Sequence, residues 1–571
     1  MCGIGGMLGQ PDRAVLSRMI DLMKHRGPDG HGIFVDDNCG LAHSRLAILD
    51  VAGSPQPLHG PGKVAVVNGE IYNYLGLKDT SYNYTTNGDS EIILSLHSGK
   101  GSANDYAKWI SKLDGMFAFA LWSNEQLILA RDPVGIKPLM RTIVDDCLIF
   151  ASEAKALRAH EGYVPAIDGL AMKARIAWEY PLDATTLFAE VHQVRPGTVE
   201  VWELIDGKPK MTSMSRFEVQ KVDPADKWND PEGLLESFTL SVSDRLMADV
   251  PVGIVLSGGL DSSLVCAVAR QAAEIAHQPV PACWTVAESE DNPDWQAAEL
   301  VASSLDLEHH QHILDPDTFH SRLPDLAWHG EDLDVTVLFF QPLFAKMAES
   351  VTVGLCGQGA DELHAGYPRY RDLQSHSTVV GQRLEDLNCD LSNLHGDSWW
   401  NDNHSADAHT NSLQEFLQFE LESGQLSNFQ LRLVDRHSMA HGLEVRVPFL
   451  GSRHREASSK LPMDCRLPPS LEEKAALRSA AKLTSLPTEI IRRPKLPAGR
   501  ATSPRMIDSL LKELNPYVEQ IAKRHPELEH ALIKQPEIAI GLGLFESMHI
   551  LDGGKSKRVG DVTTLLDEVI Y

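Results

Sequence analysis

The chain is 571 residues long with a formal net charge of −27, a length that predicts two or more domains and an acidity that argues against nucleic acid as an obligate partner. No apolar run reaches the ~18 residues of a membrane-spanning helix, and the start lacks the basic-then-apolar pattern of an export signal. The eight cysteines are scattered without the paired spacing of metal ligands, which predicts reduced thiols in a cytoplasmic protein.

The first part of the chain, residues 1–204, is predicted to be a layered domain of strands and helices. Short apolar runs bounded by turn residues are typical of strands, as in 64–67, 117–122 and 127–130. Helical periodicity is also present, for example over 14–24. A chain of this pattern buries its strands beneath helices.

A polar segment with several lysines, aspartates and prolines, 205–230, is predicted to be a linker. Beyond it, 231–571 begins with short β-rich runs that alternate with helical stretches, the pattern of a parallel sheet with crossover helices. From about residue 415 the pattern is mostly helical. The predicted fold class is α/β and multidomain, with a doubly wound parallel sheet and a helical C-terminal part in the second domain.

The cysteine at position 2 offers chemistry that no other residue of the chain offers. If Met1 is removed, Cys2 carries a thiol and a free α-amine, and an α-amine titrates near pH ~8. The amine can then act as the base for its own thiol, so that nucleophile and base lie in one residue. Taken alone, Cys2 is equally well explained as a loose terminal thiol, and the rest of the sequence has to decide.

Further polar residues in the first 90 positions would serve an amide hydrolase. Asn68 offers a side-chain amide and Gly69 a backbone N–H to a developing oxyanion. Arg45 could hold an α-carboxylate, while Glu70 and Asp89 could hold an α-ammonium, which together describe glutamine. Taken singly, these residues have ordinary explanations: Asn-Gly is most often a hairpin turn, and Arg45 and Asp89 would be surface charges or a helix cap.

Eight motifs carry a family resemblance. They run, in chain order, MCGI, HRGPDG, HSRLAILD, VVNGEIYN, GDSEIIL, LDGMFAFALW, LARDPVGIKPL and FASEAKAL. In these motifs the chain resembles the class II glutamine amidotransferases, and most closely the variant fused to asparagine synthetases. The resemblance implies a four-layer αββα domain with an N-terminal nucleophile, Cys2, and an oxyanion hole made by Asn68 and Gly69. It implies glutamine ligands at Arg45, Asn68, Gly69, Glu70 and Asp89.

A second candidate site, with a glycine-rich loop, follows a short apolar run at 252–256. The run leads into SGGLDSS at 257–263 and then into an apolar helix. Small residues at such a turn let backbone N–H groups approach a phosphate. The segment lacks the Gly-Lys-Ser/Thr ending of a Walker A loop and resembles the pyrophosphate loop of ATP pyrophosphatases, which cleave ATP to AMP and diphosphate. Asp261 is then a plausible ligand for Mg²⁺.

Residues 231–500 resemble the synthetase domain of asparagine synthetases. GQGADE at 357–362 resembles its second glycine-rich loop, with Asp361 as a second Mg²⁺ ligand. Lys474 matches the lysine that neutralises charge on the phosphorus during adenylation, and Lys495 matches a basic position near the phosphates. The resemblance implies ATP contacts at Val255, Ser257, Gly258, Gly259, Asp261, Ser262, Val286, Cys356, Gly357 and Lys495.

Two positions depart from the bacterial reference of this family on the acceptor side. Gln358 stands where the reference has a glutamate thought to form the adenylate or deprotonate ammonia; it stays among the predicted catalytic residues, although an amide cannot act as a base. Glu362 is a stand-in that the sequence does not place. Phe339 stands where the reference has an arginine held to engage aspartate, while Thr336 is retained. A buried carboxylate without its cation is unfavourable unless another donor replaces it.

The resemblance implies an ATP- and Mg²⁺-dependent ligase that makes L-asparagine from L-aspartate with ammonia from L-glutamine. Its partners are small molecules, without nucleic acid or membrane; a homodimer is compatible with the sequence, which does not define the oligomeric state. Two sites also imply an apolar ammonia tunnel, with Met116, Phe117 and Leu443 as expected wall residues. Two alternatives stay open: the same machinery acting on another carboxylate, and a glutaminase or glutamine-binding regulator with a degenerate synthetase half.

Overall fold

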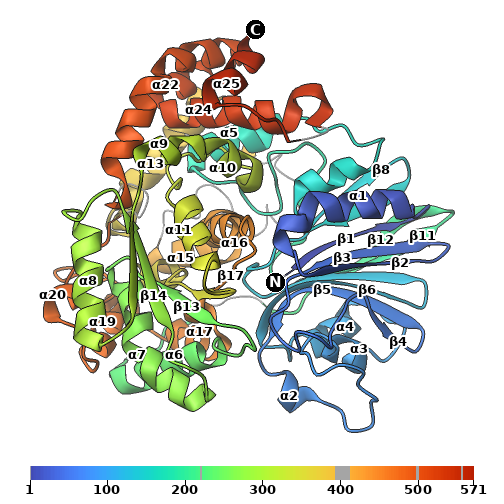
Figure 1. The fold of residues 1–571 in the computed structure, drawn as a ribbon, viewed down its shortest axis with the longest axis horizontal. Helices are drawn as coiled ribbons and strands as arrows, with labels where there is room; N and C mark the ends of the chain where they lie inside the picture. The colour runs from blue at the N-terminus through green and yellow to red at the C-terminus, as the bar shows by residue number, and fades with distance from the viewer. Residues whose placement is uncertain (1, 219–221, 392–411, 497–500, 555–556) are drawn as a thin grey trace.

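The structure is a computed structural model that describes residues 2–218, 222–391, 412–496, 501–554 and 557–571. Two antiparallel sheets occupy the N-terminal half, drawn in blue and cyan in Figure 1, and a parallel sheet lies in the C-terminal half. Helices from the end of the chain, drawn in red, cap the molecule at the top of that view. The α/β multidomain prediction is confirmed.

The two N-terminal sheets have six strands each. The first has the order β10-β8-β9-β1-β3-β2, with bounds β1 Cys2–Leu8, β2 Gly30–Val35, β3 Cys39–Arg45, β8 Met140–Val144, β9 Cys147–Ala151 and β10 His192–Gln193. The second has the order β12-β11-β7-β6-β5-β4, with bounds β4 Leu58–Gly60, β5 Lys63–Ile71, β6 Gly115–Ser123, β7 Gln126–Arg131, β11 Thr198–Ile205 and β12 Lys208–Arg216. All pairs within the two sheets are antiparallel.

Four layers result, because each sheet buries both of its faces. Ile4 of β1, Val66 of β5 and Ala118 of β6 belong to one apolar cluster between the sheets. The outer face of the first sheet is covered by α1 (Arg13–Met23), and that of the second by α3 (Ile92–Leu96) and α4 (Ala103–Ile110). The αββα architecture expected from the motifs is therefore present (Figure 1).

The segment predicted to be a linker has to be corrected in part. Strand β12 (Lys208–Arg216) lies inside 205–230 and pairs antiparallel with β11 along its whole length. Its composition looks like that of a linker because it is an edge strand, and five of its nine residues are exposed. An edge strand needs few apolar side chains. Residues 222–230, which precede α6 (Pro231–Asp244), contain no helix or strand.

The C-terminal half is built on five parallel strands in the order β15-β14-β13-β16-β17. Their bounds are β13 Val252–Val255, β14 Ala282–Ala287, β15 His309–Ile313, β16 Val353–Leu355 and β17 Glu444–Arg446. The connections include α7 (Leu260–Ala276), α8 (Pro293–Leu305), α10 (Leu323–Gly330), α11 (Phe340–Ala348) and α12 (Ala360–His364). The strand order reverses between β13 and β16, and the carboxyl ends of such strands are where doubly wound sheets bind ligands.

Helices complete the second half, as predicted. The remaining long ones are α13 (Leu373–Asp386), α15 (Leu413–Glu422), α16 (Leu431–Met439), α17 (Ser452–Ser459), α22 (Pro504–Arg524), α24 (Pro536–Phe545) and α25 (Val562–Ile570). Three of them, α22, α24 and α25, pack on one another, and α24 also contacts α10. This terminal group therefore braces the connection that leads from β15 to β16.

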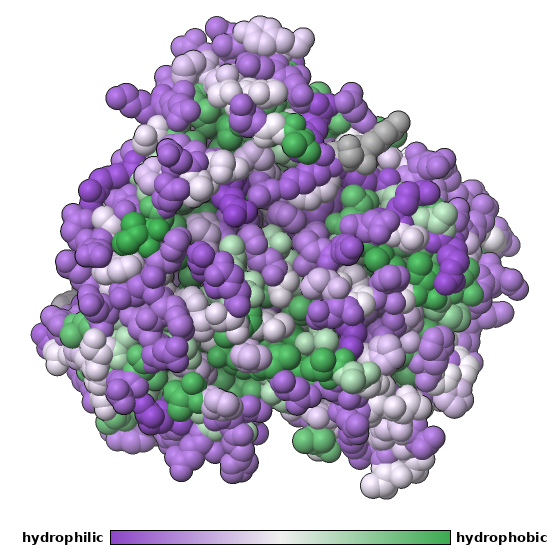
Figure 2. Space-filling model, in the orientation of Figure 1, coloured by the Kyte–Doolittle hydropathy of each residue, from purple (hydrophilic) through white to green (hydrophobic). Residues whose placement is uncertain are grey.

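The surface is mostly polar on the face shown in Figure 2. On the face that Figure 2 shows, hydrophilic residues predominate and hydrophobic ones form small separate patches. The large hydrophobic side chains that are most exposed come from separate parts of the chain: Leu75, Val164, Leu471, Val559 and Tyr571. Within the described ranges, none of the helices combines the length and the apolar character needed to cross a bilayer.

Candidate functional site

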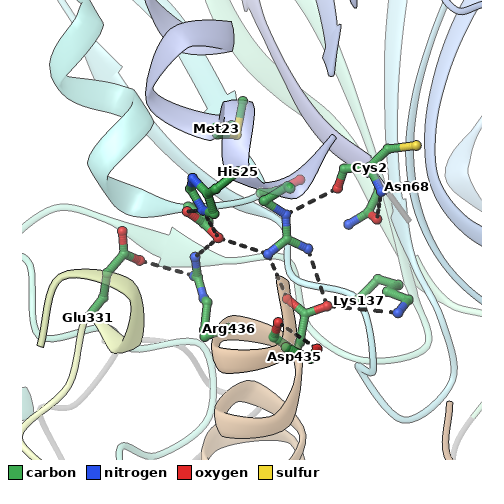
Figure 3. Close-up of polar contacts among 12 residues, drawn as sticks. Cys2, Met23, His25, Asn68, Lys137, Glu331, Asp435 and Arg436 are labelled. Carbon is green, nitrogen blue, oxygen red and sulfur yellow. Dashed lines mark hydrogen bonds and ion pairs between the residues drawn. The ribbon is translucent and has the colours of Figure 1, made fainter. Parts of the chain in front are cut away.

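Cys2 is fixed at the first position of β1. Its backbone N–H donates to Asn68 Oδ1 at 3.0 Å, so the two sheets meet at this residue (Figure 3). The side chain is buried, and burial raises the pKa of the thiol. A base beside the thiol is therefore needed to make it a nucleophile, and the α-amine exposed by removal of Met1 would supply one on the same residue.

Cys2 lies in the wall of an open hollow of about 420 Å³. The hollow brings together Cys2, Arg45, Gly69, Glu70 and Asp89, which come from β1, β3, β5 and the turn before α3. Of the residues predicted to bind glutamine, Asn68 alone does not line it, although Asn68 contacts the backbone of Cys2.

Two hydrogen-bond donors fit an oxyanion hole: Gly69, in the wall of the hollow, and Asn68, which contacts the backbone of Cys2. The side-chain amide nitrogen of Asn68 is buried and has no hydrogen-bond partner among the described residues. Gly69 has φ +142°, and a Cβ there would lie 1.9 Å from the carbonyl oxygen of Met116. Only glycine therefore allows β5 to lie this close to β6 while Gly69 reaches the hollow.

The charged residues of the hollow are held in place before a ligand arrives. Arg45 donates to the carbonyl oxygens of Val51 and Asp50 at 2.7 and 3.0 Å. Asp89 accepts a hydrogen bond from the Ile71 N–H at 2.7 Å, and burial raises its pKa to about 6. Burial and the neighbouring Asp89 also raise the pKa of Glu70 well above its ordinary value. The ammonium group of a bound ligand would stabilise the ionised form of both carboxylates and so lower their pKa values.

A buried ion-pair network joins the Cys2 region to the C-terminal half (Figure 3). Arg26 Nε donates to the carbonyl oxygen of Cys2 at 3.1 Å, and its Nη1 donates to Glu153 Oε1 and Asp435 Oδ2, both at 2.8 Å. Arg436, next to Asp435 on α16, pairs with Glu153 at 3.3 Å. A single side chain, that of Arg26, thus contacts both the nucleophile Cys2 and Asp435, which lies more than 400 positions further along the chain.

The second site begins where β13 ends. Gly258 adopts φ +71°, and its missing Cβ would lie 2.6 Å from Ala297 Cβ on α8, so the turn is pressed against that helix. The Ser257 N–H donates to Ser262 Oγ at 3.1 Å, which ties the loop to the first turn of α7. Gly259 is the N-cap of α7 and has no side-chain capping bond. The N–H groups of this helix end are thus available to a phosphate.

Two lysines and two aspartates meet beside this loop. Lys474 Nζ lies 2.6 Å from both Asp261 Oδ1 and Asp361 Oδ1. Lys495 Nζ lies 2.8 Å from Asp361 Oδ2 and 3.8 Å from Asp261 Oδ2. The lysines Lys474 and Lys495 hold the pKa of Asp361 well below its ordinary value, although burial opposes this shift.

The donor set fits magnesium. Asp261 and Asp361 each direct a hard carboxylate oxygen at one cation, the Lys474 ammonium, at 2.6 Å, and Mg²⁺ would bind to their carboxylates beside it. Mg²⁺ in phosphate-handling sites usually takes one or two carboxylates and completes its shell with phosphate and water. Among the described residues no group of three or more His, Cys, Asp or Glu side chains could hold a metal, so phosphate oxygens would have to contribute.

A hollow of about 800 Å³, partly open to solvent, adjoins this cluster. Most of the residues predicted to contact ATP line it: Val255, Ser257, Asp261, Ser262, Val286, Cys356, Gly357 and Lys495. Gly259 and Lys474 line an adjoining charged hollow of about 520 Å³ with Ser257 and Asp261. Of this predicted set only Gly258 lines neither, because it faces α8.

Both departures from the family reference fall on this larger hollow. Gln358 and Phe339 line it, and Phe339 is part of an aromatic wall with Phe340 and Phe344, whose rings stack at 5.0 Å. Glu362 does not line it. Its carboxyl is fully buried and accepts from Tyr367 Oη at 2.9 Å, and burial followed by the charge of Asp361 raises its pKa to about 7.

Several residues of the second site were not predicted from the sequence. Arg493 and Asp294 form an ion pair at 2.7 Å in the wall of the charged hollow, and Trp284 and Phe340 line the larger one. Arg493 had a signal, because it lies two positions before Lys495. Phe340 had none, since an apolar helical residue reads as core.

The expected tunnel wall is only partly consistent with the structure. Met116 and Leu443 are fully buried and belong to one apolar cluster that spans both halves. Phe117 belongs to a different cluster, beneath α3 and α4, and stacks on Phe119 and Phe217. Neighbouring residues of a strand face opposite ways, so Met116 and Phe117 cannot both face the interface. Phe117 is therefore not a wall residue.

Comparisons with known proteins agree with this geometry. A model of the glutamine amidotransferase domain matches residues 1–212, and a model named asparagine synthase matches residues 233–540. Asparagine synthetase [glutamine-hydrolyzing] 1 of Bacillus subtilis is 31% identical over 389 residues, which span 65% of this chain and 60% of that protein. The Mus musculus asparagine synthetase [glutamine-hydrolyzing] is 30% identical over 530 residues, 87% of this chain and 83% of the relative. Asparagine synthetase B of Escherichia coli is 31% identical over 431 residues, 70% and 72% of the two chains. The chain belongs to the asparagine synthase family.

Proposed function

We propose that this protein makes L-asparagine from L-aspartate and ATP with ammonia that it releases from L-glutamine, and that L-glutamate, AMP and diphosphate are the other products. One observation carries the proposal: Lys474 joins Asp261 and Asp361 from two glycine-rich loops, in the same chain that places Cys2 in a hollow with Arg45, Glu70 and Asp89. The names of the relatives support it, since they are glutamine-hydrolysing asparagine synthetases.

In the first site we assign the nucleophile to Cys2. Its thiolate attacks the side-chain amide carbon of glutamine, and the unpartnered Asn68 amide and the Gly69 N–H donate to the oxygen that gains charge. Ammonia leaves, and water then cleaves the glutamyl thioester to glutamate. Arg45 binds the α-carboxylate, and the buried carboxylates Glu70 and Asp89 bind the α-ammonium.

In the second site the β-carboxylate of aspartate attacks the α-phosphorus of ATP, and diphosphate leaves. Lys474 stabilises the charge on the phosphoryl oxygens, and Lys495 helps to hold the diphosphate. Bound magnesium would neutralise the phosphates, and Asp261 and Asp361 are the residues that would hold it. Ammonia from the first site then displaces AMP from the aspartyl adenylate, with the Gln358 amide as a hydrogen-bonding group at the larger hollow.

The proposal extends to the setting of the enzyme. The first domain is residues 1–216, since β12 completes its second sheet, and the second domain is 231–571, with 222–230 leading into it. All eight cysteines are free thiols, six of them buried and two partly exposed, which supports a reducing cytoplasm. A homodimer is the proposed assembly, to be measured by light scattering.

A second candidate function rests on the aromatic wall. Phe339, Phe340 and Phe344 give the larger hollow an apolar side, which favours a carboxylate with an apolar body over one with a second charge. The same adenylation and ammonia transfer would then yield another amide.

One assay distinguishes the two candidate functions from each other and from a glutaminase. Diphosphate release is measured with glutamine, ATP and a panel of carboxylates that includes aspartate and apolar acids. Aspartate alone should stimulate release, with asparagine as the product. Stimulation by an apolar acid instead of aspartate would establish the second candidate. Glutamate formation without acceptor-dependent diphosphate would identify a glutaminase and contradict both.

A further inference from the structure

Gly366 lies against the side chain that joins the two carboxylates of the adenylation site. It follows the C-cap of α12, and its N–H donates to the Asp361 carbonyl oxygen at 2.8 Å. Its φ is not positive, so it does not adopt the left-handed conformation that favours glycine. Its backbone conformation is therefore open to any residue, and the need for glycine has to be sought in the space around it.

That space is filled by the two charged groups of the site. A Cβ on Gly366 would lie 2.1 Å from Lys474 Cε, 2.9 Å from Lys474 Nζ and 2.1 Å from Asp361 Oδ1. These atoms are the ends of flexible side chains, so a methyl group could be accommodated without moving the backbone. The groups that would move are the ammonium and a carboxylate oxygen that it contacts at 2.6 Å.

Lys474 itself is held in an unusual backbone conformation. It is the N-cap residue of α19 (Ala475–Ala481) and adopts φ +58°, in the left-handed region. Non-glycine residues in this region are uncommon and cluster at functional sites. The strained backbone sets the direction of the lysine, and Lys474 Cε and Nζ fill the space that a side chain on Gly366 would need.

We propose that Gly366 is a positioning residue for adenylation, which keeps open the path along which Lys474 reaches between Asp261 and Asp361. It acts through Lys474 and touches no substrate. The proposal rests on the proposed function, because it assigns Lys474 to the adenylation step. It predicts that a single methyl group at Gly366 disables the second site and leaves the first site and the fold intact.

The test compares Gly366→Ala with Gly381→Ala, since Gly381 on α13 has no atom within 4 Å of its absent Cβ. Gly366→Ala should lower ammonia-dependent diphosphate release on the order of 10²-fold, the size of loss expected when one charge-stabilising group is displaced. Glutamate release from glutamine should match that of the wild type in both variants. The melting temperature of Gly366→Ala should stay at the wild-type value, whereas Gly381→Ala, inside α13, should melt slightly higher. In the background of Lys474→Met, Gly366→Ala should cause no further loss, because its effect passes through the lysine.

A crystal structure of Gly366→Ala provides a readout that does not depend on turnover. The Lys474 ammonium should have moved beyond ion-pair distance of Asp261 or Asp361. Retention of both contacts would overturn the proposal, as would wild-type diphosphate release by Gly366→Ala or a loss in the double variant beyond that of Lys474→Met. If the wild-type enzyme forms no diphosphate with any acceptor, the proposed function fails, and the crystallographic result still decides the role of Gly366.

Discussion

In the first site, Cys2 and Asn68 lie on strands of two facing sheets, and a hydrogen bond from the Cys2 backbone sets their distance. In the second site, Asp261 and Lys474 come from segments 213 positions apart and meet through the ends of their side chains. The first site is thus fixed by backbone geometry and the second by ion pairs. A substitution in the first should remove one function cleanly, whereas one in the second should also rearrange its neighbours.

The comparison is sharpest for the nucleophile. Cys2→Ala should lower glutamine-dependent asparagine formation by roughly 10⁴-fold or more, as the loss of a catalytic nucleophile does. Formation from ammonium chloride should persist, because the second site is intact. The two nitrogen sources are compared at saturating ATP, with Cys465→Ala as the matched control. Glutamine use that survives in Cys2→Ala would refute the role given to the thiol.

Lys474→Met tests the opposite half. It should lower diphosphate release with either nitrogen source on the order of 10³-fold, because the charge that develops at phosphorus loses its partner. Asp261 and Asp361 would also repel each other, since Lys474 contacts both at 2.6 Å. Glutaminase activity should be unchanged, and Lys346→Met, in an exposed ion pair, serves as control. Equal loss at both sites would show that they are not separable in this way.

Asn68→Ala should have a smaller effect, confined to the first site. Removal of one oxyanion donor costs about 10²-fold in kcat, and the KM for glutamine should change less than kcat. Because Asn68 Oδ1 also accepts from the Cys2 N–H, Asn68→Asp keeps that acceptor and removes the donor. The two variants should be equally slow in steady-state glutaminase assays; a fast Asn68→Asp enzyme would assign Asn68 to positioning Cys2 instead.

The smallest expected effect is a pH dependence of glutamine binding at the first site. Burial raises the pKa of Asp89 to about 6, so its carboxyl is ionised above that pH and neutral below it. Only the ionised form attracts the ammonium of glutamine, and the KM for glutamine should rise up to about tenfold per pH unit below 6. Asp89→Asn should show a high KM without this slope, unlike the exposed control Asp79→Asn. A flat wild-type profile from pH 7 to 5 would contradict the assignment.

The fold could be predicted largely from local patterns, with one instructive exception. Buried strands such as β6 and β7 are continuous apolar runs, and the β13–α7 turn carries its glycines in sequence. Strand β12 was not predicted, because an edge strand exposes one face to water and its polar composition resembles that of a loop. Its pairing with β11 is a tertiary fact that composition does not carry.

The sites divide in the same way. Residues in contiguous motifs, Arg45 and Asp361 among them, line the two hollows. Contacts between distant segments could not be read from the chain: the joint contact of Lys474 with two aspartates, and the pairing of Arg493 with Asp294. The sequence also could not show which residues of β6 face the interface between the two halves. Met116 and Phe117 are neighbouring apolar residues, and only the sheet shows that their side chains point to opposite faces.

Strand β12 also defines how this enzyme can be divided. Beneath it, β11 carries Val199 and Val201, both fully buried. A fragment that stops at residue 204 would leave the β11 edge bare, with its backbone groups unpaired and open to pairing with other molecules. Such a fragment should aggregate, whereas one that extends to residue 218 keeps its edge covered. The segment that connects the two activities thus also supplies the edge strand that protects the first domain from aggregation.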